Sequence, residues 1–287
     1  MEAMPPAEVT AYLYSRAQYF VNPSFGSEAA GGYHGYRDYL ADRAEIEVKF
    51  GEILERLEQT SAPGRLLDVG AGPGFLLAAA RARGWGGEGI DLNPWAAAYA
   101  REQVGAEVRV GALADAGFAP ARFDAVTMMD LIEHLAAPAE TIGEAARILR
   151  PGGALALLTP DAGSAISRLL GRRWPEVVRA PEHLILFSVG GLAALLARHG
   201  FEPLGWHSVG KTSTLRTLVA DVSPAAPWLA RPLGRVLERT GLADRSLHLD
   251  PRTKFCLYAR RGPDPQPAAA EPAGGRPPRV PRRAARA

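Results

Sequence analysis

Three glycines follow a short apolar stretch in the segment LLDVGAGPGFLL, which runs from Leu66 to Leu77. Glycine has no Cβ, so Gly70, Gly72 and Gly74 permit a tight turn and let a ligand come close to the backbone. A helix that begins just after them would also point its first N–H groups at that ligand. This chemistry suits the binding of a polar ligand at the end of a strand.

An acidic residue stands where the next apolar stretch ends. Asp91 is the second-last residue of this stretch, GEGIDL, and follows Gly74 by seventeen residues. A carboxylate at the end of a second strand is placed to accept two hydrogen bonds from a ribose. The glycines and the acid together indicate a ligand that contains adenosine. They do not distinguish a dinucleotide from S-adenosylmethionine, because both contain that group.

Carboxylates and imidazoles gather further along the chain. MMDLIEHL contains Asp130, Glu133 and His134, and a helical continuation would place these three on one face. PEHLILFS adds His183 beside Glu182.

Three hypotheses follow for this group. His134 or His183 is a general base or substrate contact, which we favour, because a neutral imidazole accepts protons near pH 7. Two carboxylates and two imidazoles could instead hold a divalent metal, of a kind that the residues do not specify. In the third, Glu133 and His134 close a loop through hydrogen bonds and His183 caps a helix.

The elements that must position these residues alternate along the chain from residue 65 to about 160. Apolar strands are predicted at RLLDV, GEGIDL, EVRV, FDAVTMM and GALALLT, with helices between them at 75–83, 94–104 and 138–149. Strands that alternate with helices predict a doubly wound, parallel α/β sheet. Its ligand site is expected at the carboxyl ends of the strands.

Three regions are predicted. Residues 1–60 form an N-terminal lid and helix, whose face repeats apolar residues from Ile46 to Leu57 and whose Tyr33, Tyr36, Arg37 and Arg43 are candidate ligand contacts. Residues 61–261 form the main domain, with an inserted helical segment at about 210–250. Packing on the main domain is the favoured role of that segment; pocket covering, a homodimer and membrane-surface contact are the alternatives. Residues 262–287 form a disordered tail rich in Pro and Arg.

Composition narrows the class of protein. The tail carries three excess positive charges against +2 for the whole chain of 287 residues, so the remainder is near −1 and nucleic acid is not a favoured partner. Cys256 is the single cysteine, which excludes an intrachain disulfide, and its apolar neighbours predict an inert thiol. No apolar run is long enough for a membrane span and no signal-peptide pattern opens the chain, so we expect a cytoplasmic location.

The motifs resemble those of the class I S-adenosylmethionine-dependent methyltransferases. LLDVGAGPGFLL, GIDLNP, FDAVTMMDLIEHL and ARILRPGGALALLTP stand in that family's order and spacing, and LRPGG from Leu149 to Gly153 is usual there. The resemblance implies a Rossmann-like seven-strand, mostly parallel sheet whose last strand, Thr253 to Arg260, runs antiparallel. It also implies S-adenosylmethionine as cofactor.

The resemblance assigns roles to individual positions. Around the methionine moiety it places Asp68, Gly70, Ala71, Gly72 and Gly74. Asp91 and Leu92 are the expected contacts of the ribose and the adenine. Leu113 is a further candidate at the adenine, with Asp115 as the alternative. Asp130, His134 and His183 line the methyl-transfer site as catalytic candidates, and Asp130 is also a candidate cofactor contact. The metal hypothesis resembles the sites of small-RNA 2′-O-methyltransferases and of the catechol O-methyltransferases of ubiquinone synthesis.

We therefore expect an enzyme of bacterial small-molecule type that methylates an oxygen of a secondary metabolite, glycan or quinone-type acceptor. An N-methyltransferase acting on an amino sugar or similar amine is the second choice, and metal-assisted 2′-O or catechol methylation is a further one. A nicotinamide-dependent oxidoreductase and a non-catalytic binding protein are the alternatives outside this class.

Overall fold

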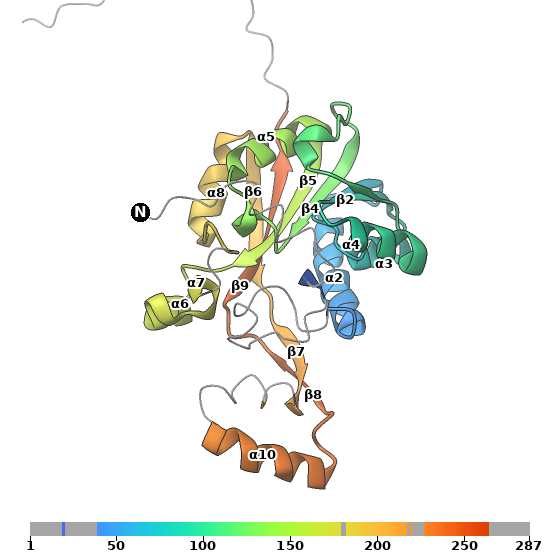
Figure 1. Cartoon of the computed structure of the whole chain (residues 1–287). Helices are drawn as coiled ribbons and strands as arrows, with labels where there is room; N and C mark the ends of the chain where they lie inside the picture. Colours follow the sequence, from blue (N-terminus) through green and yellow to red (C-terminus); the bar gives the residue numbers. More distant parts are fainter. Residues whose placement is uncertain (1–18, 21–38, 179–181, 217–218, 220–226, 264–287) are drawn as a thin grey trace, which may run out of the picture.

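The protein is described here from a computed structural model (Figure 1), over residues 19–20, 39–178, 182–216, 219 and 227–263. The predictions for Tyr33, Tyr36, Arg37 and nearly all of the tail lie outside the described residues. Everything that follows concerns the described part of the chain.

A seven-strand sheet forms the centre of the molecule. Its strands lie in the order β3-β2-β1-β4-β5-β9-β6, and β9 is antiparallel to both of its neighbours. This confirms the predicted mostly parallel sheet with an antiparallel last strand. The bounds are β1 Arg65–Val69, β2 Gly86–Asp91, β3 Val108–Val110, β4 Phe123–Met129, β5 Leu149–Pro160, β6 Phe201–Ser208 and β9 Lys254–Arg261.

Helices cover both faces of this sheet (Figure 1). The predicted helices are present, and the second of them ends in a π-helical turn, Ala100–Val104. The bounds are α2 Arg43–Glu58, α3 Phe75–Ala82, α4 Pro94–Tyr99, α5 Pro138–Ile148, α6 Ala165–Leu170, α7 Pro175–Val178 and α8 Val189–Arg198, with short 3-10 turns at Leu113–Asp115, Ile132–His134 and Gly171–Arg173.

Burial on both faces explains the near-continuous apolar sequences of the central strands β1, β4, β5 and β9. One apolar cluster joins the sheet to α2, α3 and α4, and it contains the α2 face that periodicity predicted, from Ile46 to Leu57. A second cluster on the opposite face joins the sheet to α5 and α8. Cys256 is fully buried in β9, and burial raises the pKa of its thiol to about 12, as expected for an inert side chain.

An arm leaves the sheet between β6 and β9. It contains a two-stranded ladder, β7 Lys211–Thr214 with β8 Ser246–Leu249, and the helix α10 Pro227–Thr240. The sequence predicted the helix but not the two strands. Figure 1 shows α10 at the far end of the ladder, away from the sheet, so the favoured role of packing on the main domain is wrong for this helix. None of the helices among the described residues is long and apolar enough to cross a membrane.

Candidate functional site

A cavity of about 220 Å³ opens at the carboxyl ends of β1, β2 and β4. Its wall also includes Tyr19 and Phe20 from the N-terminal region. The predicted positions that line it are Asp68, Gly70, Ala71, Gly72, Asp91, Leu92, Leu113, Asp130 and His134. The parallel strands therefore bring together, at one edge of the sheet, residues that are far apart in sequence.

The glycine loop turns sharply from β1 into α3. Gly72 has φ +50° and its N–H donates to Oδ2 of Asp91 at 2.7 Å; a Cβ there would lie 3.1 Å from the Phe20 ring. Gly74 has φ +82°, and a Cβ there would lie 3.0 Å from the side chains of both Ala100 and Ala106. Gly72 thus keeps the backbone open toward the cavity, whereas Gly74, which is not part of the cavity wall, lets α3 approach the next helix.

Two carboxylates of the cavity wall are fastened by short hydrogen bonds. Oδ1 of Asp91 accepts from the N–H of Asn93 at 2.7 Å, so both oxygens of this residue are held by backbone donors. Burial outweighs these bonds and raises the pKa of Asp91. Asp68 accepts from the Thr127 hydroxyl at 2.7 Å, and burial raises its pKa to about 7. The wall is therefore acidic; backbone N–H groups hold Asp91 in place and the Thr127 hydroxyl holds Asp68.

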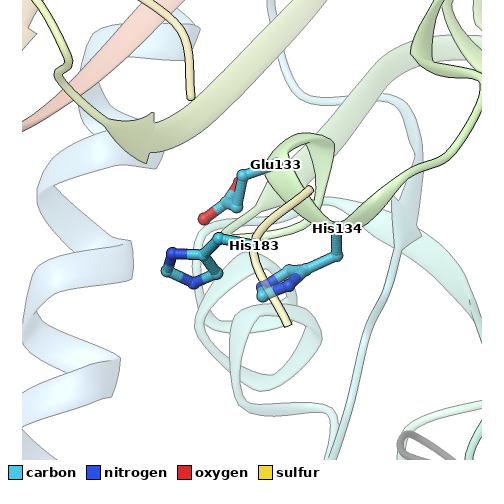
Figure 2. Close-up of side chains that lie close together, drawn as sticks. All are labelled: Glu133, His134 and His183. Carbon is cyan, nitrogen blue, oxygen red and sulfur yellow. The ribbon is translucent and has the colours of Figure 1, made fainter. Parts of the chain in front are cut away.

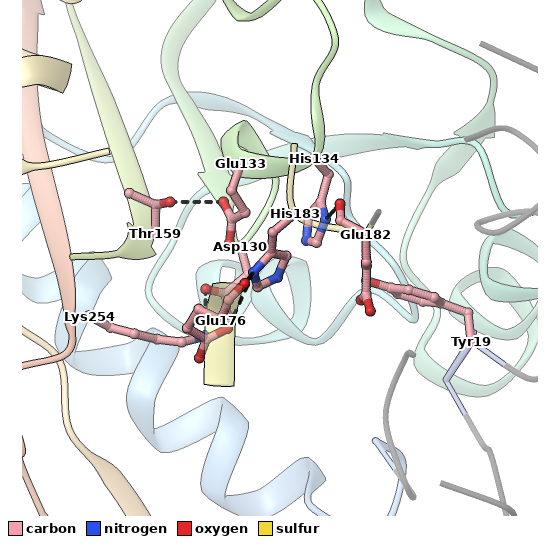
Figure 3. A network of polar contacts seen from close by, with 9 residues as sticks. All are labelled: Tyr19, Asp130, Glu133, His134, Thr159, Glu176, Glu182, His183 and Lys254. Carbon is pink, nitrogen blue, oxygen red and sulfur yellow. Dashed lines mark hydrogen bonds and ion pairs between the residues drawn. The ribbon is translucent and has the colours of Figure 1, made fainter. Parts of the chain in front are cut away.

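Asp130 does not lie on a helix with Glu133 and His134. It adopts the left-handed conformation, with φ +51°, directly after β4, and a 3-10 turn follows. The sharp turn brings its carboxylate 2.9 Å from the ammonium of Lys254 (Figure 3). Burial alone would raise the pKa of Asp130, but the charges of Lys254 and Lys49 lower it to about 2. Asp130 is therefore an ion-paired carboxylate at neutral pH.

His134 and His183 lie side by side, with their ring centres 4.8 Å apart (Figure 2). Nδ1 of His134 is 2.8 Å from the carbonyl oxygen of Glu182. Nδ1 of His183 is 3.1 Å from the carbonyl oxygen of Glu176 and 3.3 Å from its carboxylate. Those oxygens only accept, so Nδ1 is the donor in both rings, and Nε2 is the basic nitrogen of each neutral imidazole.

Glu133 completes this group from the 3-10 turn. Its carboxyl is 1% exposed and accepts from the Thr159 hydroxyl at 2.9 Å. Burial, together with the nearby charge of Asp130, raises the pKa of Glu133 to about 8. One side-chain donor atom from each of Glu133, His134 and His183 lies within 4.8 Å of the others. Of these three, His134 alone is part of the cavity wall.

Comparison with known proteins bears on this arrangement. A family model described as a methyltransferase domain matches residues 39–204, which is more than half of the chain. The chain belongs to this methyltransferase family. The match includes the glycine loop, the acid at the end of β2 and the acid–imidazole group, so the family resemblance drawn from the motifs is confirmed.

Two relatives of the methyltransferase are named as ubiquinone biosynthesis O-methyltransferases. The protein of Azoarcus sp. is 38% identical over 97 residues, or 32% of this chain and 42% of that protein. The protein of Xanthomonas campestris is 39% identical over 108 residues, or 35% of this chain and 45% of that protein. The alignments thus span less than half the length of these relatives.

The fold of the methyltransferase also matches solved structures. A SAM-dependent methyltransferase from Archaeoglobus fulgidus superposes with a TM-score of 0.53 at 15% identity, covering 78% of this chain and 99% of that one. This likeness concerns the Rossmann-like fold. The family implies S-adenosylmethionine as cofactor.

Some of the predicted cofactor contacts of the methyltransferase line the cavity and others do not. Leu113 is buried and lines the cavity, and Leu92 is partly exposed on its rim. Asp115, the other candidate for the adenine contact, is not part of the cavity wall. Arg43 donates to Glu47 at 2.7 Å, outside the wall, although it was a candidate for the methionine carboxylate.

One charged residue next to the cavity wall of the methyltransferase, Lys254, was not predicted from the sequence. It opens β9, 124 positions after its partner Asp130. One signal was present: the chain has only three lysines, Lys49, Lys211 and Lys254, among 33 basic residues. Two of these three act electrostatically on Asp130. The chain uses lysine at this position although almost all of its other basic residues are arginine. The ammonium group of lysine is more compact than a guanidinium group.

Replacing Lys254 with methionine is expected to destabilise the methyltransferase by about 2 kcal/mol, because Asp130 would remain charged in a mostly buried position. The Lys254 side chain is about a third exposed, which keeps the loss below that of a fully buried pair. Urea unfolding measures the change. The double variant Lys254→Met, Asp130→Asn should regain most of the loss, and an equal loss in both variants would contradict this account.

Proposed function

We propose that the chain transfers the methyl group of S-adenosylmethionine to an oxygen of a small molecule, with His134 as the general base. The observation that carries the proposal is the placement of His134. It lies on the cavity wall, and its Nδ1–H donates to the Glu182 carbonyl, so Nε2 is the atom that takes a proton.

The reaction requires few groups. The acceptor oxygen bonds to the methyl carbon as the carbon–sulfur bond breaks, the electron pair stays on sulfur, and the acceptor proton passes to Nε2 of His134. The leaving group is good, so alignment and water exclusion supply much of the acceleration. The base matters because a hydroxyl holds its proton near neutral pH, whereas an uncharged amine does not need one.

The charge of the cavity supports a cationic ligand. Asp68 and Asp91 line the wall beside the glycine loop. A sulfonium and an ammonium group are attracted to such a surface, whereas the pyrophosphate of a dinucleotide is repelled. This supports S-adenosylmethionine over a nicotinamide cofactor. The names of the two relatives support an oxygen acceptor, and amine methylation is the second choice.

Calorimetry and a methyl-transfer assay test the proposal together. We expect S-adenosylmethionine to bind and NAD not to bind. Incubation with methyl-labelled S-adenosylmethionine and a set of catechol, phenol, sugar and amine acceptors should label the hydroxyl compounds first. Failure to bind S-adenosylmethionine would overturn the proposal, and labelling of amines alone would replace the oxygen acceptor.

Glu133, His134 and His183 favour one second candidate, metal-assisted methylation (Figure 2). The residues fit a divalent cation, because each imidazole is oriented through its Nδ1 in the way that metal-binding histidines usually are. A bound cation would lower the pKa of an acceptor hydroxyl. A chelator that abolishes turnover, with recovery on adding Mg²⁺, Mn²⁺ or Zn²⁺, would favour this candidate over His134 as base.

The pH dependence of cofactor binding tests the role of Asp68. Burial raises its pKa to about 7, so this carboxyl holds a proton below that pH, and a cationic ligand binds the ionised form better. Affinity for S-adenosylmethionine is expected to rise with pH up to about 7, by at most about tenfold per pH unit, and then to level off.

Calorimetry across this range measures the effect, and Asp68→Asn should remove the pH dependence. In the unliganded protein the same group acts on folding in the opposite direction. Its folded pKa exceeds the unfolded value near 3.9, so its contribution to stability falls between about pH 4 and 7. A wild-type affinity that falls with pH would contradict the assignment.

A further inference from the structure

The helix α10 has two distinct sides that no part of the proposed reaction uses. Arg231, Arg235 and Arg239 recur every four residues and form one exposed stripe. The single acid of the helix, Glu238, is paired with Arg216 at 3.1 Å, so the stripe keeps an excess of positive charge. Most of the other residues of the helix are apolar, and α10 is strongly amphipathic.

Only part of that apolar surface is covered. Ala230 and Leu237 are buried, and Gly234 faces Val219 from the same arm. Three further apolar side chains of α10 are exposed: Trp228 is 77% exposed, Val236 55% and Leu233 43%. Trp228 precedes Arg231 by three residues, which places it on the arginine side of the helix, whereas Leu233 and Val236 lie on the adjoining apolar side. A helix that needed its apolar residues only for packing within the arm would not present these three side chains to water.

The position of the arm connects this surface to the candidate site. The ladder leaves the sheet beside Lys254, whose carbonyl oxygen accepts from the N–H of Val209 at 3.0 Å. Lys254 is the partner of Asp130 on the cavity wall. The arm therefore projects from the same edge of the sheet as the cavity, with α10 at its far end (Figure 1).

We propose that α10 is a docking surface for an anionic lipid bilayer. Trp228, Leu233 and Val236 enter the interface between headgroups and acyl chains, and the three arginines bind headgroup phosphates. A basic amphipathic helix with an exposed tryptophan has the composition of helices that lie in that interface. Docking in this way brings the cavity edge of the sheet toward the bilayer.

Charge argues for lipid rather than a second copy of the chain. Two α10 helices packed through their apolar sides would bring two arginine stripes into proximity, which is unfavourable. A bilayer that contains phosphatidylglycerol offers the opposite charge on the whole surface. The bilayer also has room for the apolar side chains without a matching groove.

Vesicle flotation with the full chain tests the proposal, without cofactor or acceptor, so its failure would leave the methyl-transfer proposal standing. The wild type should bind vesicles that contain phosphatidylglycerol, bind phosphatidylcholine vesicles weakly, and release with added salt. Removing the stripe with Arg231→Gln, Arg235→Gln and Arg239→Gln should weaken binding by about a hundredfold, since each basic residue contributes about fivefold.

A charged residue in the apolar side tests the second contact. Val236→Asp should abolish flotation, and the matched control Val48→Asp, at a 63% exposed valine on α2, should leave it unchanged. Absence of wild-type binding to anionic vesicles would overturn the proposal. A second result would also overturn it: the wild type is a dimer, Val236→Asp converts it to a monomer, and the variant still floats with the vesicles. The surface would then bind a second copy of the chain.

Discussion

Replacing His134 with alanine is expected to lower kcat for an oxygen acceptor by a factor of about 10² to 10⁴, the usual contribution of a general base. The affinity for S-adenosylmethionine should change little, because the imidazole contributes only part of the cavity wall. Turnover with labelled cofactor measures the first quantity and calorimetry the second. The acidic limb of the pH–rate profile should disappear with the imidazole.

His134→Asn separates the base from the structural role of the ring. The asparagine amide can replace the Nδ1–H donor to the Glu182 carbonyl but supplies no basic nitrogen. We expect this variant to fold as well as the wild type and to be as slow as the alanine variant. Full activity of His134→Asn would refute the role of His134 as general base. The control is His199→Ala, in the turn after α8, which should leave kcat and cofactor affinity unchanged.

Replacing Asp91 with alanine is expected to raise the Kd for S-adenosylmethionine by about a hundredfold, because charge-assisted hydrogen bonds contribute about 1.5 to 3 kcal/mol each. The loss has two sources. The variant removes the acceptor expected for the ribose hydroxyls, and it releases the N–H groups of Gly72 and Asn93 that both oxygens hold at 2.7 Å. Calorimetry measures the change.

Asp124 is the matched control for Asp91. It also accepts a backbone N–H at 2.7 Å, from Arg65, and a side-chain donor from Arg150 at 2.5 Å. It lies at the opposite end of the strands, as the second residue of β4 and beside the start of β1. Asp124→Ala should cost stability without changing cofactor affinity. An equal loss of affinity in both variants would mean that Asp91 acts only by holding the fold.

The parts of the fold that follow from local pattern were predictable. The apolar runs around Asp68 and Asp91, and the spacing from Ile46 to Leu57, depend on residues a few positions apart, and the structure places them as expected. The glycine loop is equally local. The antiparallel direction of the last strand came from the family resemblance. The order of the strands was not predicted, since periodicity says nothing about which strand lies beside which.

The missed features depend on long-range contacts. Asp130 left the predicted helical face because its backbone turns into the left-handed region, where its carboxylate meets Lys254 from β9. No residue near Lys254 in the sequence indicates that its partner is Asp130, 124 positions earlier. The pairing of β7 with β8 was likewise invisible, because four-residue strands joined through a helix carry no periodic signal long enough to detect.

The place of β9 within the sheet has a consequence for how the protein folds. β9 follows every other strand in sequence, yet it lies between β5 and β6 and pairs with both. The strands from β1 to β5 can associate as they are synthesised, whereas β6 has no partner in the sheet until residues 254–261 arrive. Contacts of such high sequence separation form slowly because a long loop must close first. Since Lys254 arrives with that strand, the site gains its ammonium group in the same late step that closes the sheet.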